Sequence, residues 1–171
     1  MHGTPVHLRS DFRTGITLIE CAGAALILGL LITTGLRAAA QAGASQAISA
    51  RSVTGTLLAE SLMNDILLLP YADPAGGTFI GIDSGESAAN KSTFDDVDDF
   101  DQWTESPPTS STGTTMAGFA GWTRSVRVYR ASLSNPDSNS GAESGLKRIE
   151  VTVKFGSKDV CKLTSLRSAA S

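Results

Sequence analysis

The side chains best able to do chemistry lie in one short acidic stretch, residues 94–101, which reads FDDVDDFD. Its carboxylates are Asp95, Asp96, Asp98, Asp99 and Asp101. Crowded carboxylates repel one another unless they are solvated, protonated or bridged by a cation, and Ca²⁺ binds six to eight oxygen ligands. Two interpretations stay open. The five aspartates form a Ca²⁺ site, or the stretch is a solvated loop in which Phe94, Val97 and Phe100 turn inward.

Other chemistry has little support in the sequence. The two histidines, His2 and His7, both lie near the start of the chain. Cys21 and Cys161 lie in segments of very different character and predict neither a zinc site nor a disulfide. No nucleophile-elbow, P-loop or dinucleotide-binding motif occurs. Catalysis is therefore not predicted. The net charge is −3 and no basic stripe is present, so nucleic-acid binding is not predicted either.

One further acid, Glu20, falls inside a long apolar run. Residues 16–36 read ITLIECAGAALILGLLITTGL, with Glu20 as their one charged residue. About 20 apolar residues cross the hydrocarbon core of a bilayer, so the run predicts a membrane-spanning helix. A carboxylate at the centre of such a span costs roughly 2.5–3.5 kcal/mol on insertion scales. Glu20 therefore needs a partner from outside the run, unless it lies near the headgroups and is solvated there.

Residues 13–20, RTGITLIE, resemble the N-terminal processing motif of type IV pilins and pseudopilins. In that family a membrane peptidase cuts after the Gly and methylates the new N-terminal residue. The Glu is thought to pair with the N-terminal amine of a neighbouring subunit. The resemblance implies cleavage between Gly15 and Ile16, methylation of Ile16 and an assembly role for Glu20. Ile16 stands where Phe is usual, and Arg37 stands where many pilins carry Pro, so the chain is more similar to minor pilins and pseudopilins than to major ones.

The resemblance also implies a function and a location. The chain would be a structural subunit of a type IV pilus or of a type II secretion pseudopilus. Its partners would be other subunits, the prepilin peptidase, the membrane and an assembly platform in the inner membrane. It would cross the cytoplasmic membrane once, with leader 1–15 in the cytoplasm before processing and the C-terminal domain in the periplasm. The alternative is a single-pass membrane protein whose outer domain binds a ligand such as Ca²⁺, with no filament role.

The elements that position these residues can be read from the same sequence. Segment 37–69 contains no Pro, and apolar residues recur every three or four positions from Leu58 to Leu69, as on one face of a helix. Because the residue before a proline disfavours the α conformation, Pro70 should end this helix. We therefore expect one helix from about Ile16 to about Leu69, with the span 16–36 as its first half.

The remainder, residues 70–171, is expected to be a small β-rich domain. An acidic and Ser/Thr-rich loop, 83–116, lies within it. Expected strands are 78–82, 123–133, 148–155 and 160–166, the last two as a hairpin. With 171 residues, the chain has room for one such domain and an anchor. The predicted fold class is α+β: a long N-terminal helix packed on a small antiparallel β-sheet.

Overall fold

The computed structural model describes residue 15 and residues 17–169. The residues expected in the leader before Gly15, and Ile16 with its predicted methylation, lie outside the described residues. The chain divides into two units, Met1–Gln46 and Ala47–Ser171. Helix α1, Leu18–Leu67, belongs to both units.

The first unit consists, in its described residues, of the beginning of α1. Its large apolar side chains are exposed, including Leu26, Leu31 and Leu36. This helix holds a stretch near its N-terminus that is long and apolar enough to cross a membrane, and none of that stretch is buried within the protein.

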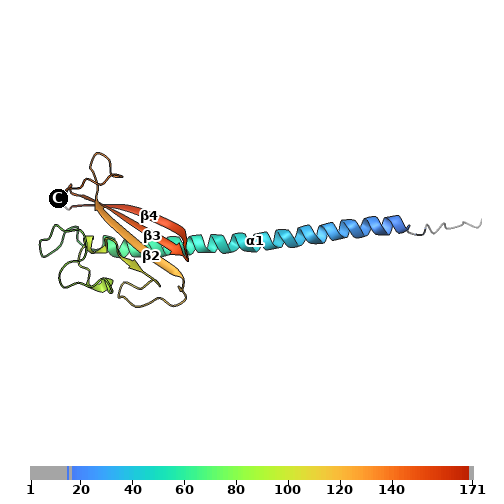
Figure 1. Ribbon diagram of the computed structural model, residues 1–171, viewed down its shortest axis with the longest axis horizontal. Coiled ribbons are helices and arrows are strands. Elements are labelled where there is room, and N and C mark those ends of the chain that lie inside the picture. The colour runs from blue at the N-terminus through green and yellow to red at the C-terminus, as the bar shows by residue number, and fades with distance from the viewer. Residues whose placement is uncertain (1–14, 16, 170–171) are drawn as a thin grey trace, which may run out of the picture. The chain divides into compact units, whose positions relative to one another are not determined.

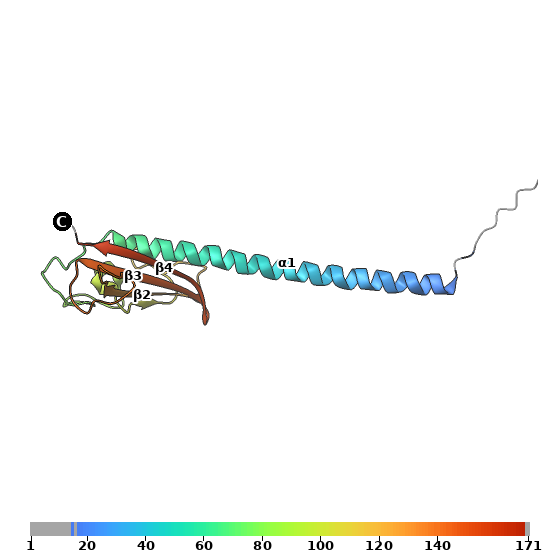
Figure 2. The ribbon, with the colours of Figure 1, turned by 90° about the horizontal axis from the view of Figure 1, so that it is seen from above.

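The second unit contains a four-stranded antiparallel sheet with the order β1-β2-β3-β4. The strands are β1 Thr104–Glu105, β2 Trp122–Arg130, β3 Leu146–Phe155 and β4 Lys158–Ser168. In this unit the end of α1 runs across one face of the sheet (Figures 1 and 2). The predicted α+β fold is confirmed.

The core of the second unit lies between α1 and the sheet. Apolar side chains on one face of the helix are buried there, namely Leu58, Ala59, Leu62, Met63 and Ile66. They meet β3 residues at every second position, Ile149, Val151 and Val153, because alternate side chains of a strand share one face. Burying a leucine side chain stabilises a fold by roughly 1.5–3 kcal/mol, so this contact is what holds the helix to the sheet.

A glycine allows the helix to approach the sheet closely. A Cβ atom added at Gly55 would lie 2.6 Å from Cγ1 of Val160 and 3.5 Å from the Trp122 ring. The register of β3 and β4 shifts between Val153 and Lys154, near the position of Val160 on the partner strand. The missing side chain at Gly55 therefore accommodates this irregular part of the hairpin.

Residues 78–82 do not form a strand: Phe79 is 67% exposed, and Gly81 has a φ of 128°, which interrupts an extended run. The long loop 83–116 contains two short 3₁₀ helices, Lys91–Thr93 and Asp98–Phe100, as well as β1.

The same loop contributes aromatic side chains to the core. Phe94 and Phe100 pack edge to face with ring centroids 4.8 Å apart, and Phe100 packs on Trp103 at 5.7 Å. Phe94, Val97 and Phe100 are all buried, which confirms that they turn inward. The acidic stretch is therefore fixed to the core by its apolar residues.

Candidate functional site

The acidic stretch is less exposed than the solvated-loop interpretation expected. Asp96 and Asp99 are 1% exposed and Asp98 is 5% exposed, so that interpretation is wrong for these three carboxylates. These three aspartates lie between the buried side chains of Phe94, Val97 and Phe100, whereas Asp95 stays exposed. The five aspartates then separate into groups with different partners.

Asp98 and Asp101 are paired with basic side chains. Asp98 Oδ2 lies 2.7 Å from Lys147 Nζ, which also donates to the Tyr71 carbonyl and lies 4.1 Å from the centre of the Tyr71 ring. Asp101 Oδ1 accepts from the Val128 amide at 2.9 Å and lies 3.4 Å from Arg127 Nε. Both carboxylates serve to attach the loop to the sheet.

Asp96 forms hydrogen bonds within its own loop. Its Oδ1 accepts hydrogen bonds from the amides of Asp98 and Asp99, at the start of the second 3₁₀ helix. Burial raises the pKa of Asp96 to about 6, against the effect of these backbone hydrogen bonds. This side chain therefore has a structural role, since it accepts from two amides at the start of that 3₁₀ helix.

Asp95 and Asp99 come together, with Glu86 as a third carboxylate. One oxygen from each of the three lies within 4.8 Å of the others. Asp99 Oδ2 accepts from the amides of Asp95 and Asp96, each at 3.0 Å. Burial, together with the neighbouring carboxylates and against the two backbone hydrogen bonds, raises the pKa of Asp99 to about 7. Within residues 17–169, none of the three forms an ion pair with a basic side chain.

This trio is the part of the loop whose donors suit a divalent cation. Hard cations such as Ca²⁺ prefer carboxylate oxygens, and no neighbouring base competes for them here. Of the five predicted ligands, only Asp95 and Asp99 meet. Asp96, Asp98 and Asp101 face other partners. Glu86 was missed because it lies nine residues before Asp95, in a loop whose path no local pattern indicates.

A buried ion pair lies at the other end of the loop. Arg124 on β2 is fully buried and pairs with Glu105 on β1. Its Nη1 donates to the Leu58 carbonyl of α1 at 3.3 Å, and its Nη2 donates to the Thr109 carbonyl at 2.6 Å. One guanidinium thus ties the helix, the sheet and the loop together.

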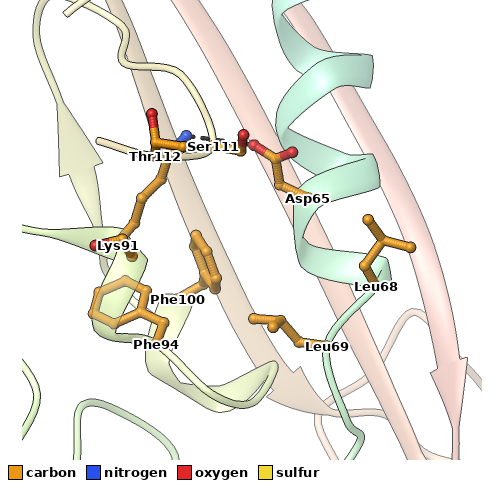
Figure 3. A pocket seen from close by; sticks show the side chains of 9 residues that line it. Asp65, Leu68, Leu69, Lys91, Phe94, Phe100, Ser111 and Thr112 are labelled. Carbon is orange, nitrogen blue, oxygen red and sulfur yellow. Dashed lines mark hydrogen bonds and ion pairs between the residues drawn. The ribbon is translucent and has the colours of Figure 1, made fainter. Parts of the chain in front are cut away.

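A hollow of about 470 Å³ lies beside this network (Figure 3). Lys91 and Asp65 approach each other there, with Lys91 Nζ 3.4 Å from Asp65 Oδ2. The ammonium also donates to the Thr109 carbonyl at 3.2 Å and lies 5.7 Å from the centre of the Trp103 ring. Burial lowers the pKa of Lys91. These contacts make Lys91 a fixed structural cation.

The remaining predicted site lies at the start of α1. The Glu20 amide donates to Thr17 Oγ1 at 3.4 Å, and Glu20 Oε2 accepts from the Thr17 amide at 2.8 Å and from its hydroxyl at 2.9 Å. This reciprocal pair is a capping box, in which two side chains satisfy free amides of the first helical turn. Gly15 precedes it and has no other atom within 4 Å of an added Cβ. No basic side chain of the described chain pairs with Glu20.

Comparison with known proteins does not place the chain in a family. No protein-family model matches the sequence, and searches of curated proteins and of solved structures each found no match.

Proposed function

We propose that the chain is a structural, non-catalytic subunit of a type IV pilus or type II secretion pseudopilus, of the minor pilin or pseudopilin kind. It is cleaved after Gly15 by a prepilin peptidase and methylated on Ile16. Residues 16–36 then anchor it in the inner membrane and pack against other subunits at the assembly platform. The outer domain lies in the periplasm and contacts neighbouring subunits.

The surroundings of Glu20 are the observation that carries this proposal. Its carboxylate lies in the first turn of a 50-residue helix, followed by a long exposed apolar stretch. Its polar contacts within residues 17–169 are with Thr17 alone. A carboxylate in this position gains most from a cation supplied by another chain. The amine of a neighbouring processed N-terminus has the required charge.

Processing is the first step to test. Mass spectrometry of the protein from its native membrane should find an N-terminal, methylated Ile16 in place of Met1. The same measurement on a Gly15→Ala variant should find unprocessed chain. An intact Met1 on the mature, membrane-bound wild-type protein would argue strongly against the proposal.

Three variants separate the capping role of Glu20 from its proposed pairing role. Thr17→Ala removes the cap but keeps the carboxylate, with an expected loss of about 0.5–2 kcal/mol in helix stability. Glu20→Gln keeps an acceptor that suits a capping box but removes the charge. We expect Glu20→Gln and Glu20→Ala to abolish assembly while membrane insertion continues, and Thr17→Ala to assemble. If Glu20→Gln assembles as well as wild type, charge pairing is not its role.

The alternative function, a single-pass membrane protein with a Ca²⁺-binding outer domain, stays a prediction. The convergence of Glu86, Asp95 and Asp99 favours it. Calorimetric titration of CaCl₂ into the detergent-solubilised full chain would test it. Binding should be lost in Asp95→Asn and kept in Asp101→Asn, since Asp101 faces Arg127 instead. An absence of heat at millimolar Ca²⁺ would exclude this function.

A further inference from the structure

The outer edge of β4 is a long strand edge without a partner. β4 is last in the sheet order, and its other side pairs with β3. In Figure 1 it runs along the margin of the sheet. A strand edge of this kind presents N–H and C=O groups that another extended chain can bind.

The hydrogen bonds on both sides of β3 determine which groups of β4 point outward. The Ala169 amide donates to the Gly145 carbonyl at 2.9 Å, which makes these opposed residues a hydrogen-bonded pair. The Ala131 amide donates to the Leu146 carbonyl at 2.8 Å, so Leu146 directs its backbone groups to the β2 side. Antiparallel pairs alternate between hydrogen-bonded and non-hydrogen-bonded. The outward backbone groups of β4 therefore belong to Lys162, Thr164, Leu166 and Ser168.

These outward groups are accessible. All four residues are exposed, with 46% of Leu166 accessible to solvent. Across residues 17–169, no side chain or backbone group from another segment hydrogen-bonds to this edge. The edge is thus open in the isolated chain.

Protection against pairing is confined to one half of the strand. Lysines and bulges discourage edge-to-edge association. In β4 these features lie between Lys158 and Lys162, where the register shift also occurs. The other half, Leu163–Ser168, has no lysine, proline or register shift. That half can accept a strand.

The charges on β4 indicate what kind of strand fits. β4 carries three basic residues, Lys158, Lys162 and Arg167, and one acid, Asp159. The strand therefore carries a net charge of +2, so a second copy of β4 brings the same positive charge, whereas an acid-bearing strand brings the opposite one. Lys162 is neutralised by Glu150 at 2.9 Å, whereas Arg167 donates to the Leu69 carbonyl and has no ion pair within the described residues.

We propose that Leu163–Ser168 binds an extended, acid-bearing strand of a partner protein by β-strand addition. Main-chain hydrogen bonds would supply the binding, and side chains would supply the selectivity. Arg167 directs its backbone N–H and C=O groups toward Lys147 on β3. Toward a strand added antiparallel to the outer edge of β4, Arg167 therefore occupies a non-hydrogen-bonded position. Opposed side chains lie closest at such positions, and an acid of the partner strand there pairs with Arg167. This inference holds whether or not the chain enters a filament.

Amide hydrogen exchange of the full chain in lipid nanodiscs, resolved to single residues, tests the proposal. The probe is a synthetic peptide of about eight residues in which threonine and valine alternate with two glutamates. At about 1 mM peptide, exchange at Thr164, Leu166 and Ser168 should slow by about tenfold. Inward amides such as that of Ser165 should not change. A peptide with lysines in place of the glutamates should protect several-fold less.

Two variants distinguish backbone pairing from other contacts. Leu166→Pro removes an outward N–H and should abolish protection, whereas Leu166→Ala keeps that N–H and should retain it. Slow exchange at β3 amides reports that the sheet of the proline variant is intact. Arg167→Glu provides a test without proline and should reverse the preference between the two peptides.

Three results would overturn the proposal. The first is unchanged exchange with the glutamate peptide at millimolar concentration. The second is equal protection by a version of that peptide with proline at its centre, which cannot form a strand. The third is protection that rises with the concentration of the chain without peptide, since that would identify a second copy as the occupant.

Discussion

Residues 18–46 and 47–67 belong to one continuous helix, α1, but their side chains have different surroundings. In the first segment the large apolar side chains are exposed, and Glu20 bonds with Thr17 in the same helical turn. In the second segment, leucines and an isoleucine are covered by the sheet. The apolar side chains of the first segment are therefore left uncovered by this chain, whereas those of the second segment are covered by the chain's own sheet.

The two regions also differ in whether a charged side chain has an oppositely charged partner in the same chain. The second unit buries Arg124, Lys147 and Lys91, each beside a carboxylate of the same chain. Glu20 has no such internal counterpart within residues 17–169. The buried cations of the second unit therefore have counter-charges from the same chain, whereas the carboxylate at the start of α1 has only the polar groups of Thr17.

Breaking the buried pair at Arg124 should have the largest effect. Arg124→Ala leaves Glu105 buried without a counter-charge, and we expect a loss of about 3–5 kcal/mol in the free energy of unfolding. Arg127→Ala on the same strand, with a side chain 66% exposed, should cost about 0–1 kcal/mol. Urea unfolding of the solubilised full chain, followed by tryptophan fluorescence, measures both, because Trp103 and Trp122 are the only tryptophans and both are buried. Equal losses would contradict this account.

The same substitution in the two segments of α1 sharpens the comparison. Leu62 is fully buried, so Leu62→Ala should cost about 2–5 kcal/mol in the same unfolding experiment. Leu31→Ala lies in the exposed apolar stretch and should leave the tryptophan-detected transition unchanged. A shift of that transition by Leu31→Ala would mean that the two segments are coupled.

The buried carboxylates should make the second unit less stable as the pH rises. The pKa of Asp96 is raised to about 6 and that of Asp99 to about 7, against an unfolded value near 3.9. Between these values the folded chain binds more protons than the unfolded chain. The free energy of unfolding should therefore fall from pH 5 to pH 8, by on the order of 4 kcal/mol if both groups contribute in full. Asp99→Asn should flatten this dependence, and a rise in stability over the same range would refute the assignment.

Replacing either of two glycines of α1 with alanine should have different effects on stability. Gly55→Ala brings its Cβ to 2.6 Å from Val160, and we expect a loss of about 1 kcal/mol even after the gain in helix propensity. Val160→Ala should restore part of it. Gly43→Ala meets nothing within 4 Å and should be neutral or stabilising by up to about 1 kcal/mol, measured as helix content by circular dichroism. If Val160→Ala gives no rescue, the close approach is not the cause.

Local patterns in the sequence predicted the elements well. Pro70 marked the end of α1, and the alternation of Ile149, Val151 and Val153 marked β3. Residues 78–82 have β-branched and aromatic side chains but no strand, because the conformation of Gly81 interrupts the extended run. β1 was not predicted, since its two residues are extended only by pairing with β2.

The candidate sites depended on contacts between residues far apart in the sequence. Asp98 is buried because Lys147 reaches it, and 49 positions separate the two. Nothing near Asp98 in the sequence distinguishes it from Asp95, which stays exposed. The spacing of Phe94, Val97 and Phe100 predicted the inward turn of the loop. The burial of individual aspartates, by contrast, depends on partners that lie far away in the sequence.

The contact between Gly55 and Val160 also constrains how this protein can change over evolutionary time. A mutation that enlarges residue 55 would be tolerated only where residue 160 had already become smaller, since backbone and side chain fill the same space. In diverging descendants of this gene, the two positions should therefore change together and in a preferred order. Such a record would appear in an alignment of relatives as paired substitutions at two sites more than a hundred residues apart.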